Sequence, residues 1–245
     1  MVISSLMEQK KIFSTSVTRK IYNLAERLQD HLYTPLNKNC LFGQTLTLSS
    51  TRAGAQEIRE RIRKHNDVTE KQLMQNVQTL DSYLMNITRE DREIYHTSDF
   101  IKDFYRVEIK NKLTDDTKQK FHAAMNVIRM ARITVGDGID NVVKYYDSLY
   151  NKNFTAAFYF LISLVKIYDN YKKNNFKVDW EDVKYKSLSS KTIFPPTVVL
   201  MIDEAQNYNQ LEWLVIDKLI SVSQHVYIAG NNSFRARLSS GRHIK

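Results

Sequence analysis

The stretch VVLMIDEAQN at residues 198–207 decides how the fold of this chain is interpreted. The apolar run at 198–202, rich in aliphatic side chains, is typical of a buried strand. Two carboxylates, Asp203 and Glu204, follow it directly. Open α/β sheets place their chemistry beyond the carboxyl ends of their strands. The pair is therefore either the solvated end of an ordinary strand or a site that holds a metal ion and activates water.

The overall composition narrows the class of protein. The 245 residues are enough for one large domain or two small ones. With only 6 Gly and 3 Pro, and with many Leu, Ile, Lys, Glu and Asn, a helix-rich structure is favoured over an all-β fold. The formal net charge of +9 indicates a polyanionic partner, nucleic acid first, although coding bias also produces Lys-rich chains.

The cysteine count, the histidine spacing and the hydropathy argue against a disulfide-rich, a zinc-binding and a membrane-spanning protein. The single Cys40 excludes an internal disulfide framework and favours a reducing cytoplasm. The richness in Lys, Asn and Tyr fits an AT-rich genome, and for a viral gene the expected compartment is the host cytoplasm. The 6 His lack metal-ligand spacing, so no zinc site is expected. The most apolar segment, residues 154–165, is too short to span a bilayer and predicts a buried helix. The first residues lack the order of a signal peptide, and we expect no membrane partner.

The apolar pattern divides the chain into three zones. Residues 1–82 alternate β-rich runs with amphipathic helical stretches, residues 83–190 show almost no strand signal, and residues 191–245 return to β-rich runs around one helix. The expected strands are KIFST (11–15), CLFGQTLTLSS (40–50), VQTL (77–80), VVLMID (198–203) and HVYIAG (225–230). This order predicts an α/β fold in which a helical insertion subdomain at 83–190 interrupts a parallel sheet domain built from 1–82 and 191–245.

The segment IDEAQNYNQLEWLVIDKL at 202–219 closely resembles the DEAQD segment, the Walker B motif, of UvrD/Rep-like superfamily 1 DNA helicases. Other segments resemble further blocks of that family in the same order. They are SSTRAGAQEIRERI (49–62), VQTLDSYL (77–84), VDWEDVKYKSLSS (178–190) and HVYIAGNN (225–232). The resemblance covers nearly the whole chain. It implies the amino-terminal ATP-binding domain of a helicase, a RecA-like sheet of the P-loop NTPase type with a helical insertion.

The resemblance implies a role for each Walker B residue. Asp203 would hold Mg²⁺ and Glu204 would act as general base for a water molecule. Gln206 would couple the nucleotide to the DNA site. The alternative is that the geometry is inherited and has no catalytic use.

The resemblance also implies contacts with single-stranded DNA from Thr51 and Arg52 in one block and from Thr79 and Ser82 in the next. Further cations follow on the same predicted helix, namely Arg59, Arg61, Arg63 and Lys64. Such a patch would bind backbone phosphate without regard to sequence, and an ordinary solvated helix face is equally compatible with it. Aromatic residues at this spacing are more often core than base-stacking platforms, which we expect for Trp180, Tyr208 and Trp213.

The stretch STSVTRKI at 14–21 stands where the family carries its Walker A loop. Thr18, Arg19 and Lys20 would be the residues that bind the nucleotide, with Lys20 in the place of the Walker lysine. Family glycines, however, are replaced by Ser14, Val17 and Arg19, and Ile21 replaces the hydroxyl that ligates Mg²⁺. Val17 is β-branched and resists the positive φ that a phosphate cradle requires. ATP and Mg²⁺ are therefore expected only if binding survives these changes.

Other blocks depart from the family pattern as well. Asn231 replaces a carboxylate, Asn207 replaces the last Asp of DEAQD, and Asp81 replaces a His. The sequence ends at Lys245, where the family continues into a second RecA-like domain that supplies an arginine finger.

Three hypotheses follow from these departures. The chain is half of a split helicase that hydrolyses ATP only with a second RecA-like chain, or a non-catalytic module that binds single-stranded DNA or a replication protein, or a truncated remnant without a function. For the chain acting alone we expect the second.

Overall fold

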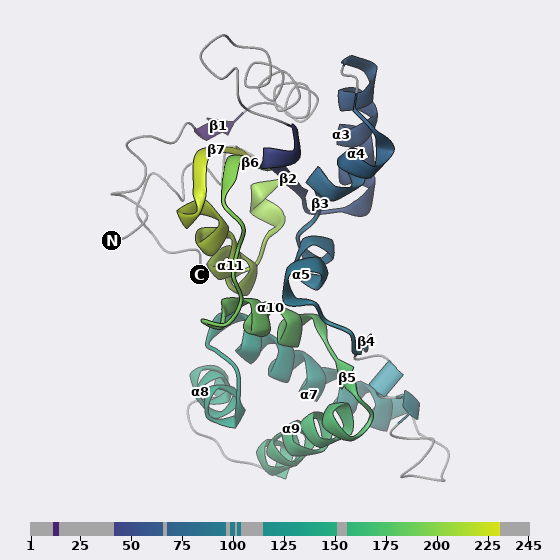
Figure 1. Ribbon diagram of the computed structural model, residues 1–245. Coiled ribbons are helices and arrows are strands. Elements are labelled where there is room, and N and C mark those ends of the chain that lie inside the picture. The colour runs from purple at the N-terminus through teal and green to yellow at the C-terminus, as the bar shows by residue number, and fades with distance from the viewer. Residues whose placement is uncertain are drawn as a thin grey trace. The chain divides into compact units, whose positions relative to one another are not determined.

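A computed structural model describes residues 12–14, 42–65, 68–96, 99–100, 102–103, 115–150 and 156–230. The chain forms two compact units (Figure 1). The sheet unit comprises the chain up to Ile87 and from Ser190 onward, and the helical unit comprises Thr88–Ser189. The first break between the units lies near the end of a helix, α5 (Leu80–Thr88), rather than near its start, where the apolar pattern placed it.

The sheet unit is built on a five-stranded sheet in which every neighbouring pair is parallel, with the order β1-β7-β6-β2-β3 (Figure 1). The strands are β1 (Ile12–Ser14), β2 (Thr45–Ser49), β3 (Val77–Thr79), β6 (Thr197–Ile202) and β7 (Ser223–Gly230). The expected α/β fold with a parallel sheet is confirmed. Because all strands run the same way, their carboxyl ends meet at one edge of the sheet.

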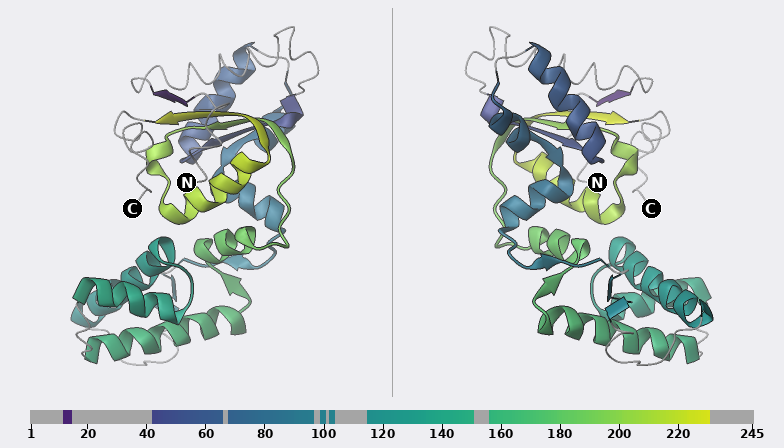
Figure 2. Two further views of the ribbon diagram at one scale, coloured as in Figure 1. Left: turned by 90° about the vertical axis from the view of Figure 1, so that its left-hand side faces the viewer. Right: turned by 90° about the vertical axis from the view of Figure 1, so that its right-hand side faces the viewer.

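Helices cover both faces of this sheet (Figure 2). On one face, α3 (Arg52–His65) and α4 (Glu70–Asn76) bury Ile58, Ile62 and Leu73 against Val199 and Met201 of β6. The opposite face is covered by α11 (Gln210–Ser221), whose buried residues include Leu211, Val215, Ile216 and Leu219. Two short 3₁₀ helices, η3 (Phe42–Gln44) and η4 (Ala205–Asn207), complete the described part of the unit. A strand covered on both faces explains the unbroken apolar run of β6.

The helical unit contains α7 (Asp115–Thr134), α8 (Ile139–Tyr150), α9 (Ala156–Asn174) and α10 (Trp180–Leu188). Gly136 and Gly138 adopt positive φ between α7 and α8, a conformation that glycine reaches without a Cβ clash. The core of the unit is rich in aromatic residues, including Phe100, Phe121, Tyr146, Phe158 and Tyr168. Two short strands that the apolar pattern did not predict, β4 (Glu93–Ile94) and β5 (Lys177–Val178), pair in parallel in this unit.

The most apolar segment of the sequence lies largely in α9. Its residues Leu161, Leu164 and Val165 are buried in the core of the helical unit, whereas Tyr159 is exposed. Across the described helices, none combines the length and the hydropathy that crossing a membrane requires.

Candidate functional site

Asp203 lies directly after β6, at the carboxyl edge of the sheet, and is only 1% exposed. Its backbone N–H donates to the carbonyl of Leu48 over 2.8 Å, which continues the pairing of β6 with β2. The hydroxyl of Ser49 donates to Asp203 Oδ2 over 3.4 Å. The strand therefore does not emerge into solvent at Asp203, and the carboxylate is held inside the sheet edge.

Glu204 takes a left-handed conformation, with φ 49° and ψ 46°, immediately before η4. A non-glycine residue in this region carries about 1 kcal/mol or more of backbone strain. The side-chain amide of Gln206 donates to Glu204 Oε2. The three residues expected from the Walker B motif thus lie together, Asp203 buried and the other two half-buried.

A small pocket of about 150 Å³ opens at the same edge, next to the ends of β2 and β3. It is lined by Ser49, Ser50, Thr51, Thr79, Leu80, Asp81, Asn207, Tyr208 and Glu212. Of the expected DNA-contacting residues, Thr51 and Thr79 line this pocket. Arg52 and Ser82 are exposed and are not among its lining residues.

Thr51 and Thr79 each stabilise the start of a helix. The hydroxyl oxygen of Thr51 accepts from the N–H of Gly54 over 3.0 Å, and that of Thr79 accepts from the N–H of Ser82 over 3.2 Å. These contacts cap α3 and α5. Because each hydroxyl acts as acceptor in its cap, its proton remains able to donate to a ligand.

The pocket also gathers two residues that depart from the family pattern, Asp81 and Asn207. Asn207 Nδ2 donates to Ser50 Oγ over 3.1 Å, although the two residues are 157 positions apart in the chain. The carboxylate of Glu212 accepts from the N–H of Asn209 over 2.9 Å as part of the capping box of α11. Ser50 and Glu212 lie in the blocks at 49–62 and 202–219 without an implied role, and their places in the pocket depend on strands and helices distant in the chain.

Tyr208 is 6% exposed, and its hydroxyl has no hydrogen-bond partner within the described residues. Burial raises the pKa of Tyr208 well above its ordinary value, and the charges of Asp203, Glu212 and Asp81 raise it further. The hydroxyl therefore stays protonated and is a hydrogen-bond donor in the middle of carboxylates. Tyr208 and Trp213 are buried, as expected of core aromatics.

The basic face of α3 is largely engaged with neighbouring groups. Arg59 donates to the carbonyl of Val77 over 3.0 Å, Arg61 pairs with Glu57 at 2.8 Å, and Arg63 pairs with Glu70. Exposed pairs of this kind contribute little to stability and weaken with salt. Arg52 is exposed in the first turn of α3 and is therefore the cation next to the candidate site, whereas the exposed Lys64 lies at the other end of that helix.

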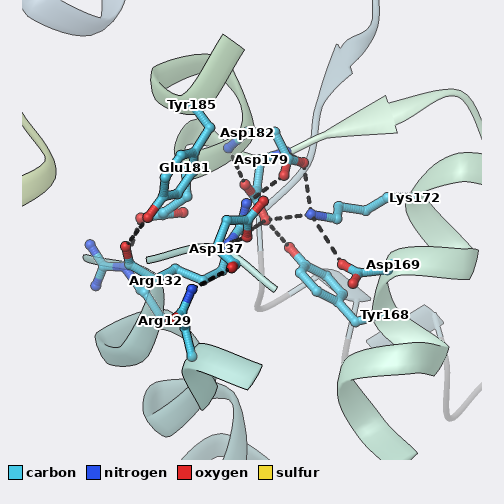
Figure 3. Close-up of polar contacts among 11 residues, drawn as sticks. Arg129, Arg132, Asp137, Tyr168, Asp169, Lys172, Asp179, Glu181, Asp182 and Tyr185 are labelled. Atoms are coloured by element: carbon cyan, nitrogen blue, oxygen red, sulfur yellow. Dashed lines mark hydrogen bonds and ion pairs between the residues drawn. The ribbon is translucent and has the colours of Figure 1, made fainter. Parts of the chain in front are cut away.

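The helical unit contains a second polar cluster, the ion network of Figure 3. Asp179 Oδ2 accepts from Arg132 at 2.7 Å, from Lys172 at 2.9 Å and from the hydroxyl of Tyr168 at 2.9 Å. Asp182 accepts from Lys172 at 2.7 Å and from Arg132. Burial alone raises the pKa of Asp179, but the charges of Arg132 and Lys172 outweigh it and hold that pKa below its usual range.

A wider pocket of about 510 Å³ adjoins this network. Cations and anions alternate in its lining, with Arg92, Lys172, Lys173 and Lys177 beside Asp137, Asp169 and Asp182. The charges therefore largely compensate one another, and the network fits a role in fixing α7, α9 and α10 together better than a role in binding a charged ligand.

Several expected site residues lie outside the described residues. These are the residues of the degenerate Walker A stretch, Thr18, Arg19 and Lys20, and Asn231 after β7. Within the described ranges, no three His, Cys, Asp or Glu side chains are grouped so that they could hold a metal ion. No protein-family model matches the chain, and no curated protein matches its sequence.

Proposed function

We propose that this chain is a homologue of the ATP-binding domain of UvrD-like superfamily 1 DNA helicases and acts as a module that binds single-stranded DNA. One observation supports this most. Segments that resemble separate blocks of that family, far apart in the chain, meet at the carboxyl edge of the parallel sheet. Ser49 and Asp203, for example, are 154 positions apart and are joined by a hydrogen bond.

The sheet order supports a RecA-like fold of the P-loop NTPase type. β1 ends at Ser14, where the Walker A-like stretch begins, and Ser14 is in register with Gly230 of β7. β7 pairs in turn with β6, which leads into Asp203. The strands before the two nucleotide-binding blocks therefore end at one edge, with β7 between them. Ligands of open α/β sheets bind at such an edge.

The residues present do not fit a complete site for Mg²⁺ and ATP. Asp203 is almost wholly buried and holds the hydroxyl of Ser49, and Glu204 accepts from Gln206. In the Walker A-like stretch, Ile21 offers no oxygen to a metal ion. We therefore derive no hydrolytic step for the chain acting alone. Thr18, Arg19 and Lys20 remain the proposed contacts for any phosphate that binds.

Binding of single-stranded DNA would use groups that remain in place. The amino-terminal ends of α3 and α5 carry partial positive charge, and the hydroxyls of Thr51 and Thr79 lie beside them. Arg52, exposed on the first turn of α3, adds a full charge. Such a combination of groups binds backbone phosphate, and this binding weakens strongly as the salt concentration rises.

Fluorescence anisotropy with a labelled single strand of about 20 nucleotides tests this proposal, because that length spans at least one typical site. We expect salt-sensitive binding that weakens in Arg52→Gln, with the slope of log K against log salt reduced by about 1. Lys71→Gln, an exposed lysine of α4 away from the edge, is the matched control and should leave the slope nearly unchanged. Absence of salt-sensitive binding by the folded chain would refute the proposal.

Calorimetry with Mg-ATP separates this proposal from the split-helicase hypothesis. We expect no heat of binding from the folded chain. Binding that is lost in Lys20→Ala would instead show that the degenerate loop still holds phosphates. That result would favour an enzyme whose second motor domain is another chain.

A further inference from the structure

We propose that the wider pocket of the helical unit binds one nucleotide of a single strand, with the base stacked on Phe176 and the phosphate group held by Lys173. The inference rests on the proposed function for the nature of the ligand. It goes beyond that function because it assigns a contact to the helical unit, outside the edge of the sheet.

Phe176 has an unusual backbone conformation. It follows the end of α9 and takes a left-handed conformation, with φ 54°. Its N–H donates to the carbonyl of Lys173 over 3.4 Å in the turn that ends the helix. A left-handed residue at this place is commonly glycine and sometimes asparagine, because a bulky side chain is strained there. The local backbone therefore does not explain the choice of phenylalanine.

The core of the helical unit does not explain the ring of Phe176 either. The residue is 63% exposed and is not among the residues that form the aromatic core of this unit. It lines the pocket of about 510 Å³ instead. Strained residues occur at ligand clamps, and an accessible aromatic ring is a platform on which a base can stack.

The size of this pocket suits one nucleotide. Its volume of about 510 Å³ lies within the range that is usual for small-ligand sites. It corresponds to the volume of about 17 molecules of liquid water. That is room for one base with its sugar and its phosphate group.

Two of the lining cations are already compensated. Arg92 donates through Nε and through a terminal nitrogen to the carboxylate of Glu90. Lys172 is held by Asp179 and Asp182 inside the ion network (Figure 3). These two side chains therefore support the fold of the unit, and we do not assign the ligand to them.

Lys173 differs from them. It is exposed, and no carboxylate of the described residues lies within ion-pair distance of it. Asp169, one turn earlier on α9, lies 3.8 Å from Lys172. The nearby Lys177 pairs at 3.5 Å with Glu93, which is 69% exposed, so this pair is weak.

The lining of the pocket therefore offers about one uncompensated positive charge next to Phe176. A phosphate group inside a strand carries one negative charge, whereas the terminal phosphate of a free nucleotide carries about two. The carboxylates of Asp137 and Asp169 in the same lining oppose any additional negative charge. The pocket thus suits a nucleotide within a strand better than a free nucleotide.

Phe176→Asn separates a role in binding from a role in the fold, because asparagine tolerates the left-handed conformation. With a labelled oligo(dT) of about 20 nucleotides, we expect anisotropy to show binding about tenfold weaker, in the range of one lost stacking contact. The urea midpoint should stay equal or rise. Phe176→Tyr keeps the aromatic face and should keep the binding. Tyr159→Asn is the matched control, an exposed aromatic residue of α9 outside the pocket, and should leave binding unchanged.

Lys173→Gln tests the phosphate contact. We expect the slope of log K against log salt to fall by about 0.7, the value for one phosphate of a single strand. Lys166→Gln removes the same charge from an exposed position of the same helix outside the pocket. Its slope should stay nearly that of the unchanged chain.

Photocrosslinking locates the contact in the full chain. The probe is the same oligonucleotide with 5-iodouracil in place of thymine, followed by digestion with trypsin, which cleaves after Lys173 and Lys177. We expect the crosslink on the fragment 174–177, which contains Phe176, and we expect its loss in Phe176→Asn. Free dTMP in molar excess over the oligonucleotide should leave this crosslink in place.

The outcomes distinguish this inference from the proposed function. Equal binding by the unchanged chain and Phe176→Asn, or a bound strand that does not crosslink to 174–177, overturns the inference and leaves the proposed function standing. Weaker binding of Phe176→Asn together with a lower urea midpoint assigns the ring to the fold and also overturns it. Displacement of the crosslink by dTMP identifies a site for free nucleotides instead. Binding that weakens in Phe176→Asn but not in Arg52→Gln supports the inference and contradicts the contact at the sheet edge. Absence of binding by the folded chain removes both.

Discussion

Arg132 of α7 donates to Asp179 over 2.7 Å, although the two residues are 47 positions apart in the chain and both side chains are buried. Asp179 is also the N-cap of α10, where its other carboxylate oxygen accepts from the N–H of Asp182. One carboxylate therefore starts a helix and ties it to α7 (Figure 3). Each buried charge is compensated by the charge of its partner. Removing one partner therefore destabilises the fold by much more than the intact pair stabilises it, because the other charge stays buried.

We predict that Arg132→Met lowers the free energy of unfolding by about 3–5 kcal/mol, because it leaves Asp179 buried with less opposing charge. Arg129→Met is the control on the same helix, since Arg129 is largely exposed and pairs with Glu181 at 3.2 Å. Its loss should cost no more than about 1 kcal/mol. Urea denaturation followed by circular dichroism measures both. Equal losses in the two variants would show that the buried network does not organise the helical unit.

The acid sensitivity of the helical unit should depend in part on Glu90. Hydrogen bonds from Arg92, opposed by burial and assisted by Lys186, lower the pKa of Glu90 from 4.5 to about 2. A carboxyl whose pKa is lower in the folded state stabilises the fold at pH values above its unfolded pKa. That contribution is lost as the pH falls from about 4.5 towards about 2.

Urea midpoints measured across that acidic range test this prediction. Glu90→Gln should be less stable at neutral pH and should show a shallower decline of stability with acid than the unchanged chain. Asp99→Asn is a suitable control, because Asp99 forms an exposed ion pair with Lys102 at the surface. Parallel pH profiles for the chain and Glu90→Gln would contradict the assignment.

Gly54 gives a prediction about the packing of the candidate site. A Cβ at this position would lie 2.4 Å from Ser49 Oγ, the hydroxyl that donates to Asp203. Gly to Ala in a helix normally stabilises by up to about 1 kcal/mol. Here we expect the opposite sign, a loss of about 1–3 kcal/mol, because the added methyl group displaces Ser49.

The matched control is Gly43→Ala, where an added Cβ has no atom within 4 Å. It should leave the urea midpoint close to that of the unchanged chain. A stabilised Gly54→Ala protein would mean that Ser49 moves aside without cost and that its contact with Asp203 contributes little.

The left-handed conformation of Glu204 gives a prediction about backbone strain in the candidate site. Glu204→Gly and Glu204→Ala both remove the carboxylate that accepts from Gln206, but only glycine adopts the left-handed conformation without a Cβ clash. After the larger chain entropy of glycine in the unfolded state is subtracted, we expect the glycine variant to be more stable by roughly 0.5–1 kcal/mol. Thermal unfolding compares the two. A more stable alanine variant would indicate that the turn relaxes out of the left-handed region.

Much of the sheet unit could be predicted from sequence because its central strands, β2 and β6, are buried on both faces. A run of apolar residues rich in Val and Ile and without polar interruption, as in β6, directly predicts a buried strand. β4 and β5 could not be predicted, since strands of two residues are set by tertiary contacts rather than by local preference.

The candidate site was predictable only where the resemblance implies a role for a residue, as it does for Thr51, Thr79 and Asp203. Ser50 and Glu212 belong to the same blocks without an implied role, and they join the pocket through the topology of the sheet. Tyr208 was correctly expected in the core, but an apolar pattern does not show that its hydroxyl lies among carboxylates. Of the pairing of Arg132 with Asp179, the local sequence indicates only that Asp179 begins a helix, through the D-x-x-D spacing of a capping box at 179–182.

The strand order has a consequence for synthesis on the ribosome. β7, the last strand of the described chain, lies between β1 and β6, so β1 has no partner in the described sheet until Ser223–Gly230 have emerged. The helical unit is continuous in sequence and is complete well before then, so it can fold first. A nascent chain stalled before β7 would expose the edge of the apolar β6 and would be prone to aggregate. Folding of the sheet unit is therefore a late event that waits for a single strand.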